Sequence, residues 1–179
     1  KLYLAAEVRD PQHEQGGPGP GAAEGDALWV YLDTTGQGSR LSAKLTLAQT
    51  TQGPQVWDWQ SGFRLPNADV AWRATADGYV YEAAIAWDSL RARDIGAGRQ
   101  MRMEAGRGFG PSSFLDLSGR DPDSAANLAP LVLVDEASPS SQPVLSTSIA
   151  PSSTVALGIA LDQSMSITLA QQVSPDRDY

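Results

Sequence analysis

The stretch EGDALWVYLD, residues 24–33, decides the fold class. Every second residue from Leu28 to Leu32 is apolar, and side chains two apart on an extended strand share one face. The same period recurs in three further segments: LYLAAEV (2–8), RLSAKLTLA (40–48) and YVYEAAIAW (79–87). The last segment follows Ala76-Asp77-Gly78, where we expect a tight turn with a positive φ at Gly78. These patterns predict β-strands.

Strands fill the rest of the chain up to residue 135 in the same way. Residues 100–107 and 130–134 read as two more strands, and no amphipathic pattern of ten or more residues predicts a helix. Many short strands separated by turn signals are typical of two packed sheets. We therefore predict an all-β fold, a two-sheet antiparallel sandwich of the jelly-roll or immunoglobulin-like kind.

The composition changes after residue 135. Residues 136–179 are rich in serine and proline, but 154–161 and 165–173 still alternate apolar residues. An isolated hairpin is marginal in water, so these two strands need a sheet to cover them. We expect a domain at 1–135 and a strand-bearing C-terminal extension at 136–179 that pairs with the sandwich or with a partner protein.

Charge and cysteine content exclude several classes of function. The 179 residues carry a formal net charge of −8 and contain no cysteine. An acidic chain without a basic patch does not favour nucleic acid as a partner. Disulfides and zinc–thiolate sites are excluded, and no stretch approaches the ~18 apolar residues of a membrane span.

The order of motifs resembles family 9 carbohydrate-binding modules and the wider DOMON-like sandwich group. The matching pieces are LYLAAEVRD (2–10), EGDALWVYLD (24–33), GYVYEAAIAW (78–87) and LAPLVLVD (128–135). The resemblance implies a sandwich over 1–135, with an opening strand that is missing before Lys1. It also implies that sugar binds between two tryptophans on loops that correspond to 21–25 and 118–127.

Neither of those two loops contains an aromatic residue. We therefore expect the family's usual binding mode to be lost, because aromatic rings provide the platform for the apolar face of a sugar. Trp57 and Trp59 form the candidate replacement, since residues at i and i+2 of a strand face the same side and Asp58 faces the other. Gln55 and Gln60 would be hydrogen-bond partners. The alternative is that this face packs in the core or against the extension.

Metal and cofactor sites are weakly indicated. Asp10, Glu24 and Asp26 flank the first long loop and are candidate calcium ligands, with a solvated acidic loop as the alternative. His13 is the only histidine. Some DOMON relatives bind haem through methionine with histidine, but we do not expect haem, because Met101 and Met103 are typical of a core strand.

No nucleophile motif, phosphate loop or metal pair predicts catalysis. We therefore expect a non-catalytic module outside the cytoplasm, periplasmic or extracellular. The missing sugar clamp and the long extension favour an accessory subunit that docks onto other proteins of an envelope or membrane-associated assembly. The alternative is a carbohydrate-binding module with a rebuilt sugar platform, whose partner is a polysaccharide.

Overall fold

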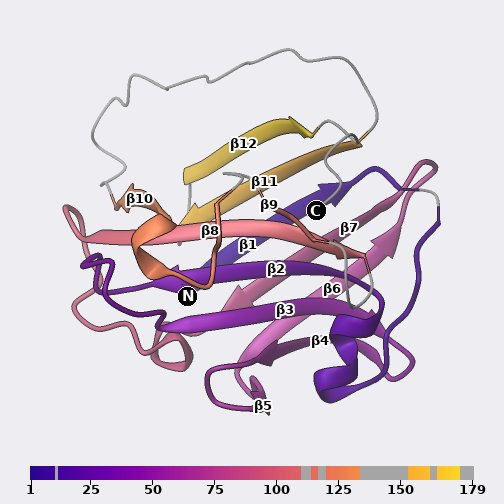
Figure 1. Cartoon of the computed structure of the whole chain (residues 1–179), viewed down its shortest axis with the longest axis horizontal. Coiled ribbons are helices and arrows are strands. Elements are labelled where there is room, and N and C mark those ends of the chain that lie inside the picture. The colour runs from indigo at the N-terminus through magenta and orange to yellow at the C-terminus, as the bar shows by residue number, and fades with distance from the viewer. Residues whose placement is uncertain (11, 110–113, 117–119, 134–152, 162–164, 174–179) are drawn as a thin grey trace.

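A computed structural model describes residues 1–10, 12–109, 114–116, 120–133, 153–161 and 165–173. These residues form two antiparallel sheets that face each other (Figure 1). Sheet A contains, in spatial order, β12 (Met165–Val173), β11 (Ser153–Leu161), β1 (Leu2–Val8), β7 (Tyr79–Ile85) and β6 (Ala68–Ala74). Sheet B contains β10 (Ala129–Val132), β8 (Gln100–Phe109), β2 (Asp26–Asp33), β3 (Ala43–Thr50), β4 (Gly53–Asp58) and β5 (Phe63–Arg64), and β9 (Phe114–Asp116) pairs with β8.

Helix in the described part of the chain is limited to short 3-10 turns, which include η1 (Gly19–Glu24), η2 (Trp87–Leu90) and η4 (Ala125–Asn127). No helix among these residues is long and apolar enough to cross a membrane. The predicted antiparallel sandwich with a strand-bearing extension is confirmed.

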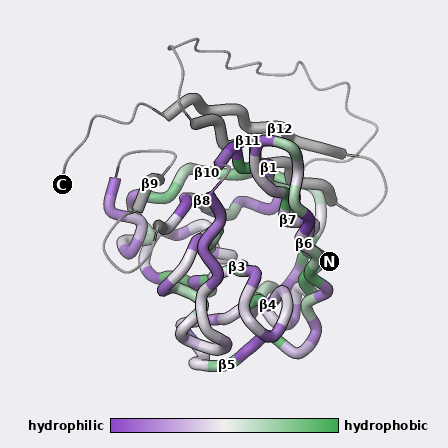
Figure 2. Tube along the Cα trace, turned by 90° about the vertical axis from the view of Figure 1, so that its right-hand side faces the viewer, coloured by the Kyte–Doolittle hydropathy of each residue, from purple (hydrophilic) through white to green (hydrophobic). Residues whose placement is uncertain are grey.

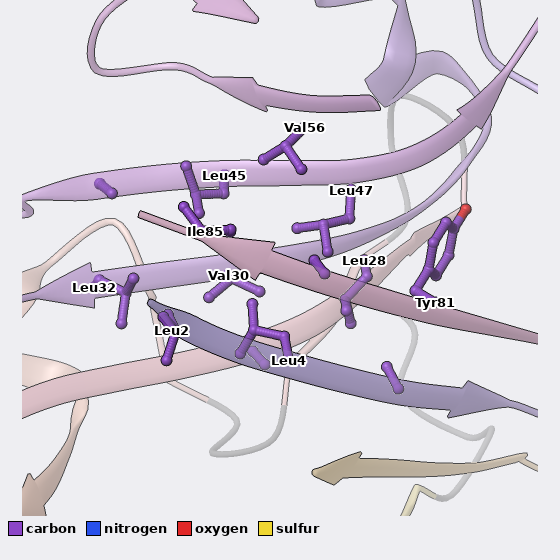
Figure 3. Packing of buried hydrophobic residues seen from close by; sticks show 14 of the residues in the cluster. Leu2, Leu4, Leu28, Val30, Leu32, Leu45, Leu47, Val56, Tyr81 and Ile85 are labelled. Atoms are coloured by element: carbon purple, nitrogen blue, oxygen red, sulfur yellow. The ribbon is translucent and has the colours of Figure 1, made fainter. Parts of the chain in front are cut away.

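The core lies between the two sheets and is built from the alternating residues of each strand. In Figure 2, β1, β7 and β6 run along the right of the interior, and β8 and β3 lie to the left. Leucine, valine and isoleucine side chains from the two sheets meet in this space (Figure 3). The inward residues of β1, β2, β3 and β7 are Leu2, Leu4, Ala6, Val8, Leu28, Val30, Leu32, Ala43, Leu45, Leu47, Tyr79, Tyr81, Ala83 and Ile85. Because every second residue points inward, the residues between them form the outer faces.

Strand β11 brings the C-terminal extension to the N-terminal strand. It pairs antiparallel with β1, from Leu2 opposite Leu161 to Val8 opposite Val155. Its other neighbour is β12, from Ser153 opposite Val173 to Leu161 opposite Met165. Strand β1 therefore has a partner on each side, because β7 pairs with its other edge.

The turn before β7 requires glycine at position 78 for a different reason from the one expected. Gly78 does not adopt a positive φ. A Cβ atom at Gly78 would instead lie 1.9 Å from the Val8 carbonyl oxygen, far inside van der Waals contact. Glycine is required here because the end of β1 approaches the backbone too closely for a side chain.

Candidate functional site

Three aromatic side chains lie together on the outer face of sheet B. Trp29 and Tyr31 alternate with the inward leucines and valine of β2 and point away from the core. The Trp29 ring stacks on Tyr31 with centroids 6.1 Å apart and planes at 17°, and on Trp59 at 5.7 Å and 18°. A methyl group at Gly108 of β8 would lie only 2.6 Å from Trp29 Nε1, so this glycine leaves room for the indole. We call Trp29, Tyr31 and Trp59 the aromatic face.

Trp59 follows directly after β4 and is held at both its backbone and its side chain. Its backbone N–H donates to the Lys44 carbonyl at 2.8 Å, and its Nε1–H donates to Thr46 Oγ1 at 2.7 Å. Thr46 is fully buried, whereas the Trp59 side chain is 37% exposed. The polar edge of the indole is therefore satisfied inside the protein, while apolar ring surface stays open to solvent.

Trp57 faces the same side as Trp59, as the sequence predicts, but it has a different environment. Its ring is half-buried and packs against Gly19 of η1, where an added Cβ would be 3.4 Å from the ring. Gln55 fixes the same turn: its side-chain oxygen accepts from the Gly19 N–H at 3.3 Å, and its Nε2 donates to the Gly19 carbonyl at 3.1 Å. Gln55 is thus buried and engaged with the backbone of η1.

Gln60 and Asp58 lie on either side of Trp59. Gln60 is exposed, and its backbone N–H donates to Asp58 Oδ1 at 3.0 Å. Asp58 points away from the aromatic face, is fully buried and pairs with Arg91 at 3.0 Å. Of the two glutamines chosen from the sequence, only Gln60 therefore presents an exposed side chain. That the ligand contacts Trp57, Trp59 and Gln60 stays a prediction.

A lysine lies over the aromatic face. Lys44 Nζ is 5.5 Å from the centroid of the Trp29 ring and 5.4 Å from that of Tyr31, in cation–π geometry. The same ammonium pairs with Asp123 Oδ1 at 2.5 Å. Asp123 belongs to the segment before β10, so residues from three separate parts of the chain meet here.

Sequence reasoning missed Trp29, Tyr31 and Lys44. The sequence did contain the information for Trp29 and Tyr31. Residues two apart on a strand share a face, so these two side chains lie on the same face, and Leu28 and Val30 lie on the other. The missing information was the strand order. Trp59 reaches Trp29 only because β3 lies between β2 and β4, and alternation does not specify which strands are neighbours.

Two of the three candidate calcium ligands, Asp10 and Asp26, pair with an arginine. Arg107 is buried, contacts the Asp10 carboxylate and pairs with Asp26 Oδ1 at 3.1 Å. Burial alone would raise the pKa of Asp10, but hydrogen bonds from the Gln12 N–H and Arg107 outweigh it and lower the pKa. Glu24 lies exposed at the end of η1. Among the described residues no group of three or more acids or histidines is placed to hold a metal ion, so calcium stays a prediction without support from this geometry.

His13 packs against two rings at the same end of the sandwich. Its imidazole centroid lies 5.0 Å from that of Trp72 and 4.7 Å from that of Tyr79. Burial lowers the pKa of His13, and the nearby Arg107 acts in the same direction. Met101 and Met103 are buried strand residues of β8. His13 therefore belongs to an aromatic cluster with Trp72 and Tyr79.

Comparisons with known proteins support the fold. No protein-family model matches the chain, and no curated protein matches it. Among solved structures, the chain is similar to a carbohydrate binding module of family 9 from Caldicellulosiruptor kristjanssonii in complex with cellotriose, with a TM-score of 0.56 and 19% identity over 83% of this chain and 74% of that one. It is also similar to such a module from the same organism in complex with glucose, with a TM-score of 0.55 and 16% identity over 79% of this chain and 75% of that one. The resemblance to this fold is thereby confirmed, and at these identities the likeness shows the fold alone.

Proposed function

We propose that this chain is a non-catalytic carbohydrate-binding module whose ligand packs on the aromatic face. The observation that carries the proposal is the stacked row of Trp29, Tyr31 and Trp59 on the outer face of sheet B, with the indole of Trp59 fixed and partly exposed. We also propose that the module acts outside the cytoplasm, as expected from the sequence.

The chemistry of the aromatic face suits a sugar ring. A pyranose has one face lined by C–H groups and a rim of hydroxyl groups, so it binds best where a flat apolar surface is bordered by polar side chains. The exposed indole of Trp59 provides the apolar surface, and the partly buried Trp29 and the buried Tyr31 stack behind it. Lys44, Asp123 and Gln60 provide polar groups near it. This differs from the two loop tryptophans that the family resemblance implies, because the platform here lies on the sheet itself.

The fold comparisons favour sugar binding over the accessory-subunit role expected from the sequence. Both similar structures are modules whose ligands, cellotriose and glucose, are sugars. The missing loop aromatics argued against the family's usual binding mode, and the sequence offered only Trp57 and Trp59 as a replacement platform. The aromatic face offers another platform.

Calorimetric titration with cellotriose and glucose tests the proposal. We expect Trp59→Ala to weaken binding by about tenfold or more, since loss of an aromatic contact worth about 1.4 kcal/mol changes affinity tenfold. Phe63→Ala is the matched control, because Phe63 is an aromatic residue that is 70% exposed and lies opposite Asp58, outside the aromatic face. Equal affinities for wild type, Trp29→Ala and Trp59→Ala would contradict the proposed site.

A further inference from the structure

The ion pair of Lys44 and Asp123 is built into the fold. Lys44 lies on β3 opposite Tyr31, and its carbonyl accepts the Trp59 N–H. Asp123 lies in a turn in which its own N–H donates to Asp121 Oδ1 at 3.0 Å. Arg102 ties the end of this segment to β8, because its Nη1 donates to the Ala126 and Leu128 carbonyls at 3.2 Å. The backbone of each partner is therefore held by the fold.

This pair differs from an ordinary surface salt bridge, which contributes little to stability. The Lys44 side chain is only 22% exposed, because its stem is covered and its ammonium lies over two rings, whereas the Asp123 side chain is 59% exposed. An ammonium has three donors and a carboxylate about four acceptor positions, and their mutual bond uses one of each. Hydrogen-bonding capacity therefore remains at the rim of the aromatic face.

We infer that Lys44 and Asp123 are the polar recognition pair of the aromatic face, and that they select a neutral sugar with two adjacent free hydroxyl groups. The inference rests on the proposed function. Lysine only donates and aspartate only accepts, so neighbouring ligand atoms must accept at one position and donate at the next. Two adjacent hydroxyl groups satisfy this requirement, and equatorial hydroxyls project from the rim of a sugar ring whose C–H face lies on the exposed indole of Trp59.

The charges favour a neutral ligand over an acidic sugar. Asp123 already neutralises the Lys44 ammonium, so a sugar carboxylate would have to compete with it. Such a ligand would also approach Asp121 and a chain of formal net charge −8. A uronic acid therefore meets repulsion that its neutral counterpart does not.

Lys44→Met and Asp123→Asn in the full chain test the pair. Methionine keeps an apolar stem over the rings, and asparagine keeps the shape of aspartate. We expect each variant to bind cellotriose about tenfold more weakly in calorimetry, since hydrogen bonds to charged groups are worth about 1.5 kcal/mol or more. Lys1→Met and Asp69→Asn are matched controls, because Lys1 and Asp69 form an exposed ion pair at 2.7 Å involving sheet A, and these variants should bind like wild type.

The outcomes separate this inference from the proposed function. If Lys44→Met and Asp123→Asn bind cellotriose like wild type while Trp59→Ala loses affinity, the aromatic site stands and the recognition pair is wrong. If no variant of Trp29 or Trp59 affects binding, the proposed site itself fails. Glucose and glucuronic acid test the ligand class in the wild type: glucose should bind more tightly, and tighter binding of glucuronic acid would overturn the choice of a neutral sugar.

Discussion

Each indole of the aromatic face is fixed by a different neighbour. Thr46 accepts the hydrogen bond of Trp59, and the absence of a side chain at Gly108 gives Trp29 its place beside β8. Side chains fixed in this way lose little conformational entropy when a ligand packs on them. Trp59 is therefore held in place by the residue beneath it, and Trp29 is accommodated by the glycine beside it.

A second effect at the level of single residues is that partly buried His13 makes stability depend on pH. Its packing between Trp72 and Tyr79 lowers its pKa, so the folded chain favours the neutral imidazole, while the unfolded chain takes up a proton near pH 6.5. Below that pH the unfolded state binds more protons, and stability falls as the pH drops towards the lower folded-state pKa. Asp26 and Asp10 oppose this shift, and burial with Arg107 outweighs them.

We predict that His13→Gln reduces the loss of stability between pH 7.5 and 5.5, because glutamine does not titrate. Urea unfolding midpoints of both proteins at the two pH values measure this. The lowered pKa values of Asp10 and Asp33 act below about pH 4 and do not contribute in this range. An equal decrease in both proteins would show that His13 is not the responsible group.

Among the elements, η1 is held to the sheet by hydrogen bonds from one side chain of β4 and by packing. Gln55 makes two hydrogen bonds to Gly19, and the same turn packs on Trp57. We predict that Gln55→Ala destabilises the protein by about 1–3 kcal/mol, because buried partners lose their hydrogen bonds. Denaturant unfolding measures the loss, and hydrogen exchange should show faster exchange within Gly19–Glu24.

Gln60→Ala is the matched control for Gln55→Ala. The bond from Gln60 to Asp58 uses the backbone N–H, so truncating the side chain leaves it in place. We expect a change within about 0.5 kcal/mol, as for most exposed positions. If the two variants are equally stable, η1 is held by packing alone.

The sequence predicts strands and their inward faces well, since a period of two is local information. The inward set of β1, from Leu2 to Val8, follows directly from alternation. Pairing is different, because nothing local to β1 specifies that Leu161 lies opposite Leu2. The aromatic face also depends on strand pairing, because Trp29, Lys44 and Trp59 meet only when β2, β3 and β4 are neighbours in this order. The proposed site therefore depends on neighbours across strands.

For the whole molecule, the pairing of β11 with β1 joins the two ends of the chain in one sheet. The two strands are about 150 residues apart in the sequence, so their pairing closes a large loop at a cost in chain entropy. Without β11, β1 would be an edge strand with unpaired backbone groups. The extension then acts as part of the sandwich, although its separation from a domain at 1–135 stays a prediction.

Deletion of residues 137–179 tests this arrangement. We predict a lower melting temperature and loss of exchange protection at those amides of β1 that point towards β11, whereas amides that point towards β7 keep their partners. Deletion of 174–179 alone is the matched control, because it leaves β11 and β12 complete, and it should unfold like the full chain. Thermal unfolding followed by circular dichroism measures the first effect and hydrogen exchange the second. An unchanged melting temperature with full protection of β1 would mean that the sandwich is complete without the extension, whose strands would then be free to pair with another protein.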